Sequence, residues 1–171
     1  GGHGSGGGPG GPGTFGYNFI KGLADRSETV EIVRHYETNK FVPGENAGIW
    51  WVPFVVKPKI PTTNGVEDNI PAIALAHELA HAEDYFNGTM KKNKVWISKQ
   101  YLEQNNYKFD DHIYDREKYA THIENKIRAQ YGLPLRTHYA VSTDGVPIEC
   151  TAILNHQSES IFYGKYKYLN N

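Results

Sequence analysis

Disulfide bonds within the chain are excluded, because Cys150 is the only cysteine among its 171 residues. The fold must therefore be stable without covalent cross-links, and the cysteine content does not indicate a redox compartment. The β-branched and apolar residues in Ile148–Ile153 predict a strand around Cys150. In such a strand a cysteine serves as a small apolar residue rather than as a nucleophile.

A broad field of one charge is also missing. The chain has 18 lysines and arginines against 19 acidic residues, which gives a net charge of −1 at pH 7. Proteins that hold phosphate backbones need clustered positive charge, so we expect no nucleic acid partner. The longest apolar stretch, Gly48–Val56, is interrupted by Pro53 and is shorter than the ~18 residues of a membrane span. We therefore expect no membrane span.

An initiator methionine and a recognisable signal peptide are absent as well. Half of the 18 glycines lie within the first 13 residues, which predicts a flexible glycine-rich linker over residues 1–14. Residues 15–171 suffice for one domain with one core, which we expect to be monomeric. This organisation suggests a domain that is secreted, or delivered into a target cell, as part of a larger protein.

Two segments have clear helix start and stop signals. Residues 71–86 begin with a proline in the first turn and end before Asn87-Gly88, a pair that commonly closes a helix. Apolar residues surround this helix on nearly every side, which predicts that it lies in the core. A second helix is predicted from about Asp115 to Tyr131, because Gly132 and Pro134 follow it.

Strands are predicted in the first third of the chain, over Thr29–Tyr36, Phe41-Val42 and Ile49–Val56. Pro53 cannot donate to a β ladder, so the strand belongs at a sheet edge or at a bulge. At an edge, the residues from Trp50 to Val56 could bind a peptide. Shorter strand-like pieces occur between residues 137 and 169. The predicted fold class is α+β, with a small mixed sheet packed on the first helix and a second helix beside it.

The first helix carries the sequence His77-Glu78-Leu79-Ala80-His81. Two histidines four positions apart project from one helix face, so both imidazoles can bind one metal ion. Glu78 lies about 100° round the helix from His77, which keeps it out of the metal's ligands but close to a water molecule bound there. Zinc lowers the pKa of such a water towards ~7, and a carboxylate can accept its proton. We therefore predict a zinc site with Glu78 as general base.

A catalytic zinc site usually has three protein ligands, so a third must come from elsewhere. Glu117 and Glu124 lie on one face of the second helix, about 10 Å apart, and only one can reach the metal. We favour Glu117, because the small Ala120 and Thr121 one turn later permit close helix packing. Glu124 is the fallback ligand, or else a supporting group paired with Arg128 or Arg136.

Other candidate ligands are weaker. Asp84 would crowd the open coordination position, and His122 points about 140° away from Glu117 on the second helix. His112, just before that helix, is a further fallback. Beyond the helix, Arg136, His138 and Tyr139 are further candidates, and the histidine or the tyrosine could stabilise the oxyanion of a tetrahedral intermediate. A plain strand start is an equally good interpretation of that segment.

With both helices placed, the chain resembles the NleD-like family of bacterial effector metallopeptidases and the toxin domains at the ends of Rhs-type polymorphic toxins. The resemblance lies in Ala76–Ala82, in Glu117-x-x-Ala120-x-x-x-Glu124-Asn125-x-x-Arg128, and in the motifs Gly132-Leu133-Pro134 and Arg136-Thr137-His138-Tyr139 that follow. It implies a zincin-like fold, zinc as cofactor, an acidic third ligand on the second helix, and a protein or peptide substrate. For a toxin it also implies a cognate immunity protein as partner.

The leading hypothesis is therefore a zinc metallopeptidase. Two alternatives remain open: a binding module that holds a metal but catalyses nothing, and a zinc amidase that acts on cell-wall cross-links. Glu78 argues against the first alternative, because a purely structural metal site needs no general base.

Overall fold

The computed structural model describes residues 10–56, 59–107 and 110–169. The linker predicted over residues 1–14 falls mostly outside this range, and residues 10–14 form turns that lead into the first helix. The elements, in chain order, are α1 (Phe15–Ala24), β1 (Glu31–Arg34), β2 (Lys40–Val42), β3 (Gly48–Trp51), β4 (Ile60–Thr62), β5 (Gly65–Glu67), α2 (Pro71–Phe86), β6 (Val95–Ile97), α3 (Lys99–Gln104), β7 (Ile113–Tyr114), α4 (Arg116–Gln130) and the short 3-10 helix η1 (Glu149–Thr151). The class is α+β, as predicted.

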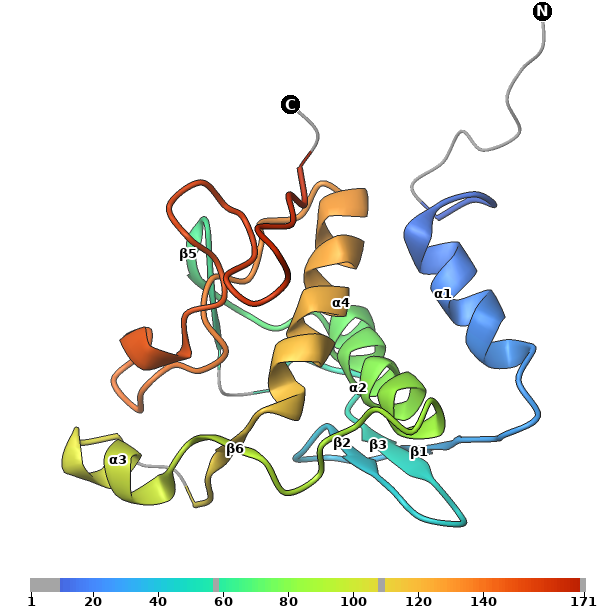
Figure 1. Ribbon diagram of the computed structural model, residues 1–171, viewed down its shortest axis with the longest axis horizontal. Coiled ribbons are helices and arrows are strands. Elements are labelled where there is room, and N and C mark those ends of the chain that lie inside the picture. Colours follow the sequence, from blue (N-terminus) through green and yellow to red (C-terminus); the bar gives the residue numbers. More distant parts are fainter. Residues whose placement is uncertain (1–9, 57–58, 108–109, 170–171) are drawn as a thin grey trace, which may run out of the picture.

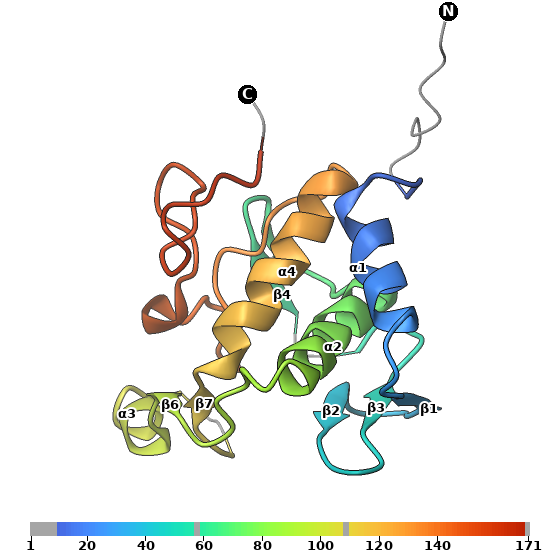
Figure 2. The ribbon, with the colours of Figure 1, turned by 45° about the vertical axis from the view of Figure 1, so that its right-hand side comes forward.

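Helices α2 and α4 form the centre of the molecule and pack against each other (Figures 1 and 2). Both end as the sequence predicts, because Gly88 and Gly132 adopt the left-handed conformation with φ of 72° and 66°. Their shared core includes Ala80 and Ala120, which are fully buried and small enough to let the helices approach closely. The His77-Glu78-Leu79-Ala80-His81 motif thus lies in the interior, facing α4.

Three small sheets surround this helix pair. The largest has the strand order β1-β3-β2, in which β1 is parallel to β3 and β2 is antiparallel to it. Strands β4 and β5 form an antiparallel pair, and so do β6 and β7. The β1-β3-β2 sheet lies against α2, whereas α1 packs on α4. Both ribbon views show the C-terminal segment on the other side of α4 from α1.

The edge position predicted for the strand from Trp50 to Val56 is wrong. Strand β3 is the middle strand of its sheet, and it ends at Trp51, before Pro53. The next residue, Val52, donates its backbone N–H to the side chain of Asn39 at 2.8 Å instead of to a strand. The edge strands are β1 and β2.

The strands predicted in the last third of the chain are largely replaced by turns and isolated bridges. The segment around Cys150 forms η1, and single bridges such as His138–Ala152 and Val141–Pro147 connect the loops. Cys150 is half-buried there, and burial raises the pKa of its thiol. Its surroundings therefore match the expected inert thiol, although not the expected strand.

None of the helices within the described residues combines the length and the apolarity that a membrane span requires.

Candidate metal centre

Three side chains from α2 and α4 converge on one point. The Nε2 atom of His81 lies 2.7 Å from Oε1 of Glu117, and Nε2 of His77 lies 3.0 Å from the same oxygen. These three side chains form the group of potential metal ligands found among the described residues, with one ligand atom from each lying within 4.8 Å of the others. The arrangement follows from the helix period, because His77 and His81 are one turn apart and face α4 together.

The spacing and chemistry of these atoms suit zinc. Two nitrogens and one carboxylate oxygen are ordinary zinc donors, and ligands about 2.0–2.1 Å from a tetrahedral ion lie about 3.3 Å from one another. The observed separations of 2.7 and 3.0 Å are slightly shorter. Three protein ligands leave a fourth position for a water molecule or a substrate, as catalytic sites require.

The surroundings of His77 also favour a cation. Its Nε2 faces Glu117 and its Nδ1 lies 2.9 Å from Oε1 of Glu124, so carboxylates contact both ring nitrogens. A neutral imidazole has one N–H and cannot donate to both. Without a metal the ring must therefore be doubly protonated: burial lowers the pKa of His77, but the hydrogen bonds to Glu117 and Glu124 outweigh this and raise it to about 10. A metal ion at Nε2 satisfies the same geometry.

Glu117 carries a negative charge in this environment. Burial alone would raise the pKa of its carboxyl group, but the electrostatic interaction with His81 and the hydrogen bonds to both imidazoles hold it well below the ordinary value. An ionised carboxylate is the form that binds a metal.

Glu124 orients His77. Its carboxylate is 1% exposed and accepts hydrogen bonds from Nε of Arg128 and Nη1 of Arg136, each at 2.8 Å. Burial opposes ionisation of Glu124, but the two guanidinium groups and His77 lower its pKa far more strongly. An ionised carboxylate bonded to Nδ1–H leaves Nε2 as the atom that can bind the metal. The pairing expected with Arg128 or Arg136 is observed with both arginines.

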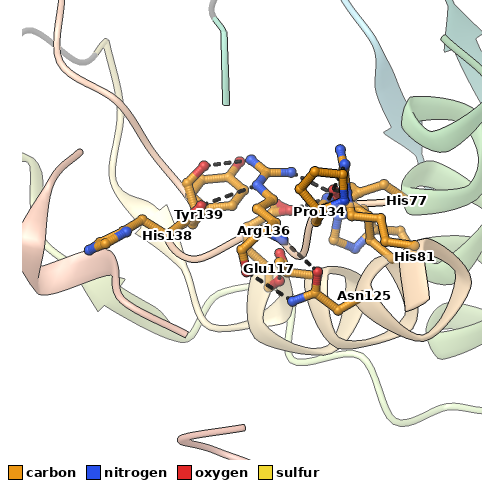
Figure 3. A network of polar contacts seen from close by, with 11 residues as sticks. His77, His81, Glu117, Asn125, Pro134, Arg136, His138 and Tyr139 are labelled. Carbon is orange, nitrogen blue, oxygen red and sulfur yellow. Dashed lines mark hydrogen bonds and ion pairs between the residues drawn. The ribbon is translucent and has the colours of Figure 1, made fainter. Parts of the chain in front are cut away.

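Arg136 connects this network to the segment that follows α4. Besides Glu124, its guanidinium donates to the carbonyl oxygens of His138 (3.2 Å) and Tyr139 (2.5 Å). The backbone of Arg136 is in turn held by the side chain of Asn125, which accepts from its N–H at 2.7 Å and donates to its carbonyl at 2.9 Å (Figure 3). Asn125 is fully buried. The sequence interpretation assigns no role to Asn125. Its position directly after Glu124 in the motif is the signal that could have identified it.

Glu78 lies beside the convergence point but is not part of it. Its side chain is buried, and this burial raises the pKa of the carboxyl group, although the positive charges of His81 and His77 act in the opposite direction. The backbone of Phe41 in strand β2 also hydrogen-bonds to this carboxyl group and lowers its pKa. Glu78 is therefore a carboxylate whose affinity for protons exceeds that of an exposed one.

Tyr139 and His138 face opposite ways. The ring of Tyr139 lies 6.4 Å from the ring of His77, and burial raises the pKa of its hydroxyl group, which stays protonated. His138 points away from the two metal-motif histidines (Figure 3), and its Nε2 lies 3.5 Å from the exposed carboxylate of Glu149. Neighbouring residues of an extended segment project to opposite sides, so only one of the two can face the site. The oxyanion role expected of His138 therefore has no support in its position.

The remaining candidate ligands lie elsewhere. Nδ1 of His112 accepts the backbone N–H of Lys99 at 2.7 Å, outside the three-residue cluster. His122 points away, as expected, and stacks on Tyr163. Asp84 accepts the hydroxyl of Thr89 at 2.6 Å just beyond the end of α2. The fallback role of His112 as a metal ligand is thus not supported.

Two cavities flank the cluster and share Thr38, Asn39, Glu78 and Tyr139 as lining residues. We call the one that reaches His77 the His77-side cavity, of about 230 Å³. The one that reaches His81 and Glu117 is the His81-side cavity, of about 530 Å³. The two cavities therefore lie on either side of Glu78 and Tyr139, next to the candidate metal centre.

Comparison with known proteins gives one family match. The family model Peptidase_M91, described as "Effector protein", matches residues 20–139 and so includes α2, α4 and the segment up to Tyr139. Neither the curated proteins nor the solved structures contain a match to the chain.

Proposed function

Because the chain belongs to the NleD-like M91 family of effector peptidases, we propose that it is a zinc metallopeptidase that cleaves a protein substrate with Glu78 as general base. The observation that carries the proposal is the convergence of His77, His81 and Glu117 next to Glu78, between two cavities that Glu78 also lines. The family establishes an effector with peptidase ancestry; the metal, the roles of the residues and the zincin-like arrangement are our inference.

His77, His81 and Glu117 would hold the ion through Nε2, Nε2 and a carboxylate oxygen. Zinc, when bound there, supplies Lewis acidity and lowers the pKa of a water in its open position towards ~7. Glu124, held by two arginines, orients His77 so that Nε2 faces the ion.

Glu78 would move the protons. Its carboxylate accepts a proton from the attacking water and later donates it to the amine of the leaving peptide. Its raised pKa supports this role, because a base with greater proton affinity than an exposed carboxylate removes a proton from water more readily. The hydroxyl of Tyr139, which lines both cavities, would donate a hydrogen bond to the oxyanion.

The peptide would run beside β2 rather than along the residues from Trp50 to Val56. Strand β2 is an edge of its sheet, and Lys40 and Phe41 line the His81-side cavity. An edge strand offers unpaired backbone groups to an extended peptide. This orientation would bring a scissile carbonyl past Glu78.

For the wider context, we propose that residues 15–171 act as the effector domain of a larger delivered protein, with residues 1–14 as a linker. An Rhs-type origin, a cognate immunity protein and a monomeric state belong to the same proposal.

The test compares wild type with Glu78→Gln, which keeps the size of the side chain but removes the base. We expect both proteins to bind one zinc per chain, and the variant to lose at least about a thousandfold in the rate of proteolysis. Casein, a cell proteome and peptidoglycan serve as parallel substrates. Full activity of Glu78→Gln, or cleavage of peptidoglycan alone, would contradict the proposal.

A further inference from the structure

The two cavities beside the candidate metal centre differ in charge. Three cationic residues belong to the lining of the His81-side cavity: Lys40 from β2, Lys92 from the loop after α2, and Arg116 from the first turn of α4. These residues are far apart in the sequence, so the fold alone brings them to one cavity. The chain as a whole is nearly neutral, and this concentration of cations is therefore a local feature.

These three cations have no carboxylate partner within 4.0 Å in the described part of the chain, unlike their neighbours. The ammonium groups of Lys94 and Lys118 both lie near Asp115, at 3.9 and 2.8 Å. The ammonium groups of Lys40 and Lys92 instead lie over the rings of Trp50 and Tyr85. They contact aromatic faces and keep their capacity to bind an anion.

Arg116 is held by a hydrogen bond and by an aromatic ring. Its Nη1 donates to the carbonyl oxygen of Lys92 at 2.7 Å, and its guanidinium lies 4.5 Å from the centre of the Tyr114 ring. The side chain is half-buried. A guanidinium has five N–H donors in one plane, and the carbonyl oxygen of Lys92 accepts only from Nη1. The others can bind a carboxylate in a bidentate manner.

Three acidic residues, Glu78, Asp111 and Glu117, line the same cavity, so carboxylates and cations are equal in number and differ in what they contact. Glu117 contacts the two imidazoles, and Glu78 is buried at the junction of the cavities. Asp111 accepts the backbone N–H of His112 at 2.7 Å and lies 3.3 Å from the hydroxyl of Tyr114. A divalent cation held at the centre would therefore give this side a net positive charge.

The His77-side cavity has the opposite character. Its cation, Arg136, is engaged by Glu124 and by two backbone carbonyls. Glu37 lines this cavity and forms no ion pair with any residue that the structure describes. Apolar groups from Val56, Ile60 and Ala74 complete the wall. The His77-side cavity is thus weakly acidic and partly apolar, whereas the His81-side cavity holds three cations that have no carboxylate partner among the described residues.

We propose that the substrate carries an acidic side chain on the His81 side of the scissile bond, bound by Arg116 together with Lys40 and Lys92. This inference rests on the proposed function, because it assigns the substrate class to the same site. On the His77 side of the scissile bond we expect no preference for acidic substrate residues, because Glu37 would repel a carboxylate there.

A binding experiment tests the cationic compartment without catalysis. The full zinc-loaded chain is titrated into fluorescein-labelled hexaglutamate and hexaglutamine, with anisotropy as the readout. The triple variant Lys40→Gln/Lys92→Gln/Arg116→Gln should bind hexaglutamate about tenfold or more weakly than wild type. The control Lys94→Gln/Lys99→Gln/Lys167→Gln removes the same charge from lysines that have acidic neighbours outside the cavity, and should bind within about twofold of wild type. Equal losses in both variants would overturn the proposal.

A cleavage experiment tests the side of the scissile bond. Peptides from a digested proteome are incubated with wild type and with the cavity variant, and the cleavage sites are identified by mass spectrometry. We expect Asp and Glu to be enriched on one side of the cut by wild type and not by the variant. Cleavage with enrichment on neither side, or on both, would overturn this inference and leave the peptidase assignment intact. Absence of any cleavage would count against the proposed function, and the binding experiment would still decide on the cationic compartment.

Discussion

His77 on α2 and His122 on α4 are both buried histidines, yet their surroundings have opposite effects on their charge. Carboxylates contact both ring nitrogens of His77 and raise its pKa to about 10. Burial and nearby Lys126 lower the pKa of His122 to about 4. His122 stacks on Tyr163 at 4.1 Å and shares a hydrogen bond of 2.5 Å with the hydroxyl of Tyr168. Burial of a histidine therefore does not indicate a metal site; the carboxylates around it do.

Replacing Glu124 is the strongest test of the difference between the surroundings of His77 and His122. The Glu124→Gln variant keeps a hydrogen bond to Nδ1 of His77 but loses the charge that favours Nε2 as the metal-binding atom. We expect zinc affinity to fall by about 10- to 100-fold. Competition with a zinc chelator measures the change. Glu149→Gln is the control, because the Glu149 side chain is 91% exposed and lies outside the centre, and it should leave the affinity unchanged. Unchanged affinity in Glu124→Gln would show that the carboxylate does not support the site.

Zinc binding should release a proton from His77. Its pKa of about 10 means that the metal-free ring is doubly protonated at pH 7.5, and a metal ion needs the lone pair of Nε2. We expect a net release of about one proton per zinc, and a gain in affinity of about tenfold per pH unit between pH 6 and 8. Calorimetry in buffers of different ionisation enthalpy measures the release. No proton release at pH 7.5 would contradict the proton arrangement inferred around His77.

His122 should affect stability rather than metal binding. Its pKa is depressed in the folded state, so the unfolded chain binds the extra proton first, and the stability that this neutral ring contributes is lost as the pH falls from about 6.5 to about 4. The shift corresponds to at most about 3 kcal/mol, and solvent screening reduces it to about 1–2 kcal/mol. His122→Phe should therefore flatten the pH dependence of unfolding by urea in this range, with zinc content unchanged. Loss of zinc in this variant would contradict the separation of the two histidines.

Helices α2 and α4, and the candidate ligands that they carry, could be predicted from local sequence. Proline in the first turn of α2 and glycine after both helices define their limits, and the four-residue spacing of His77 and His81 brings both imidazoles to one face. The proximity of Glu117 follows from small residues that let α4 pack against α2.

Long-range features could not be predicted in this way. Whether β3 lies at an edge depends on pairing with both β1 and β2, which the pattern around Pro53 does not encode. The choice between His138 and Tyr139 depends on the register of the segment after α4, and Asn125 and Arg136 set that register. The cationic lining of the His81-side cavity likewise comes from three separate elements.

The central claim is that His77, His81 and Glu117 hold one zinc ion. Diffraction at the zinc absorption edge, from crystals of the chain grown with equimolar zinc, tests it most directly. We predict one strong anomalous peak within about 2.0–2.2 Å of Nε2 of His77, Nε2 of His81 and a carboxylate oxygen of Glu117. A peak that lacks these ligands, or fully loaded protein with no peak between α2 and α4, would contradict the account.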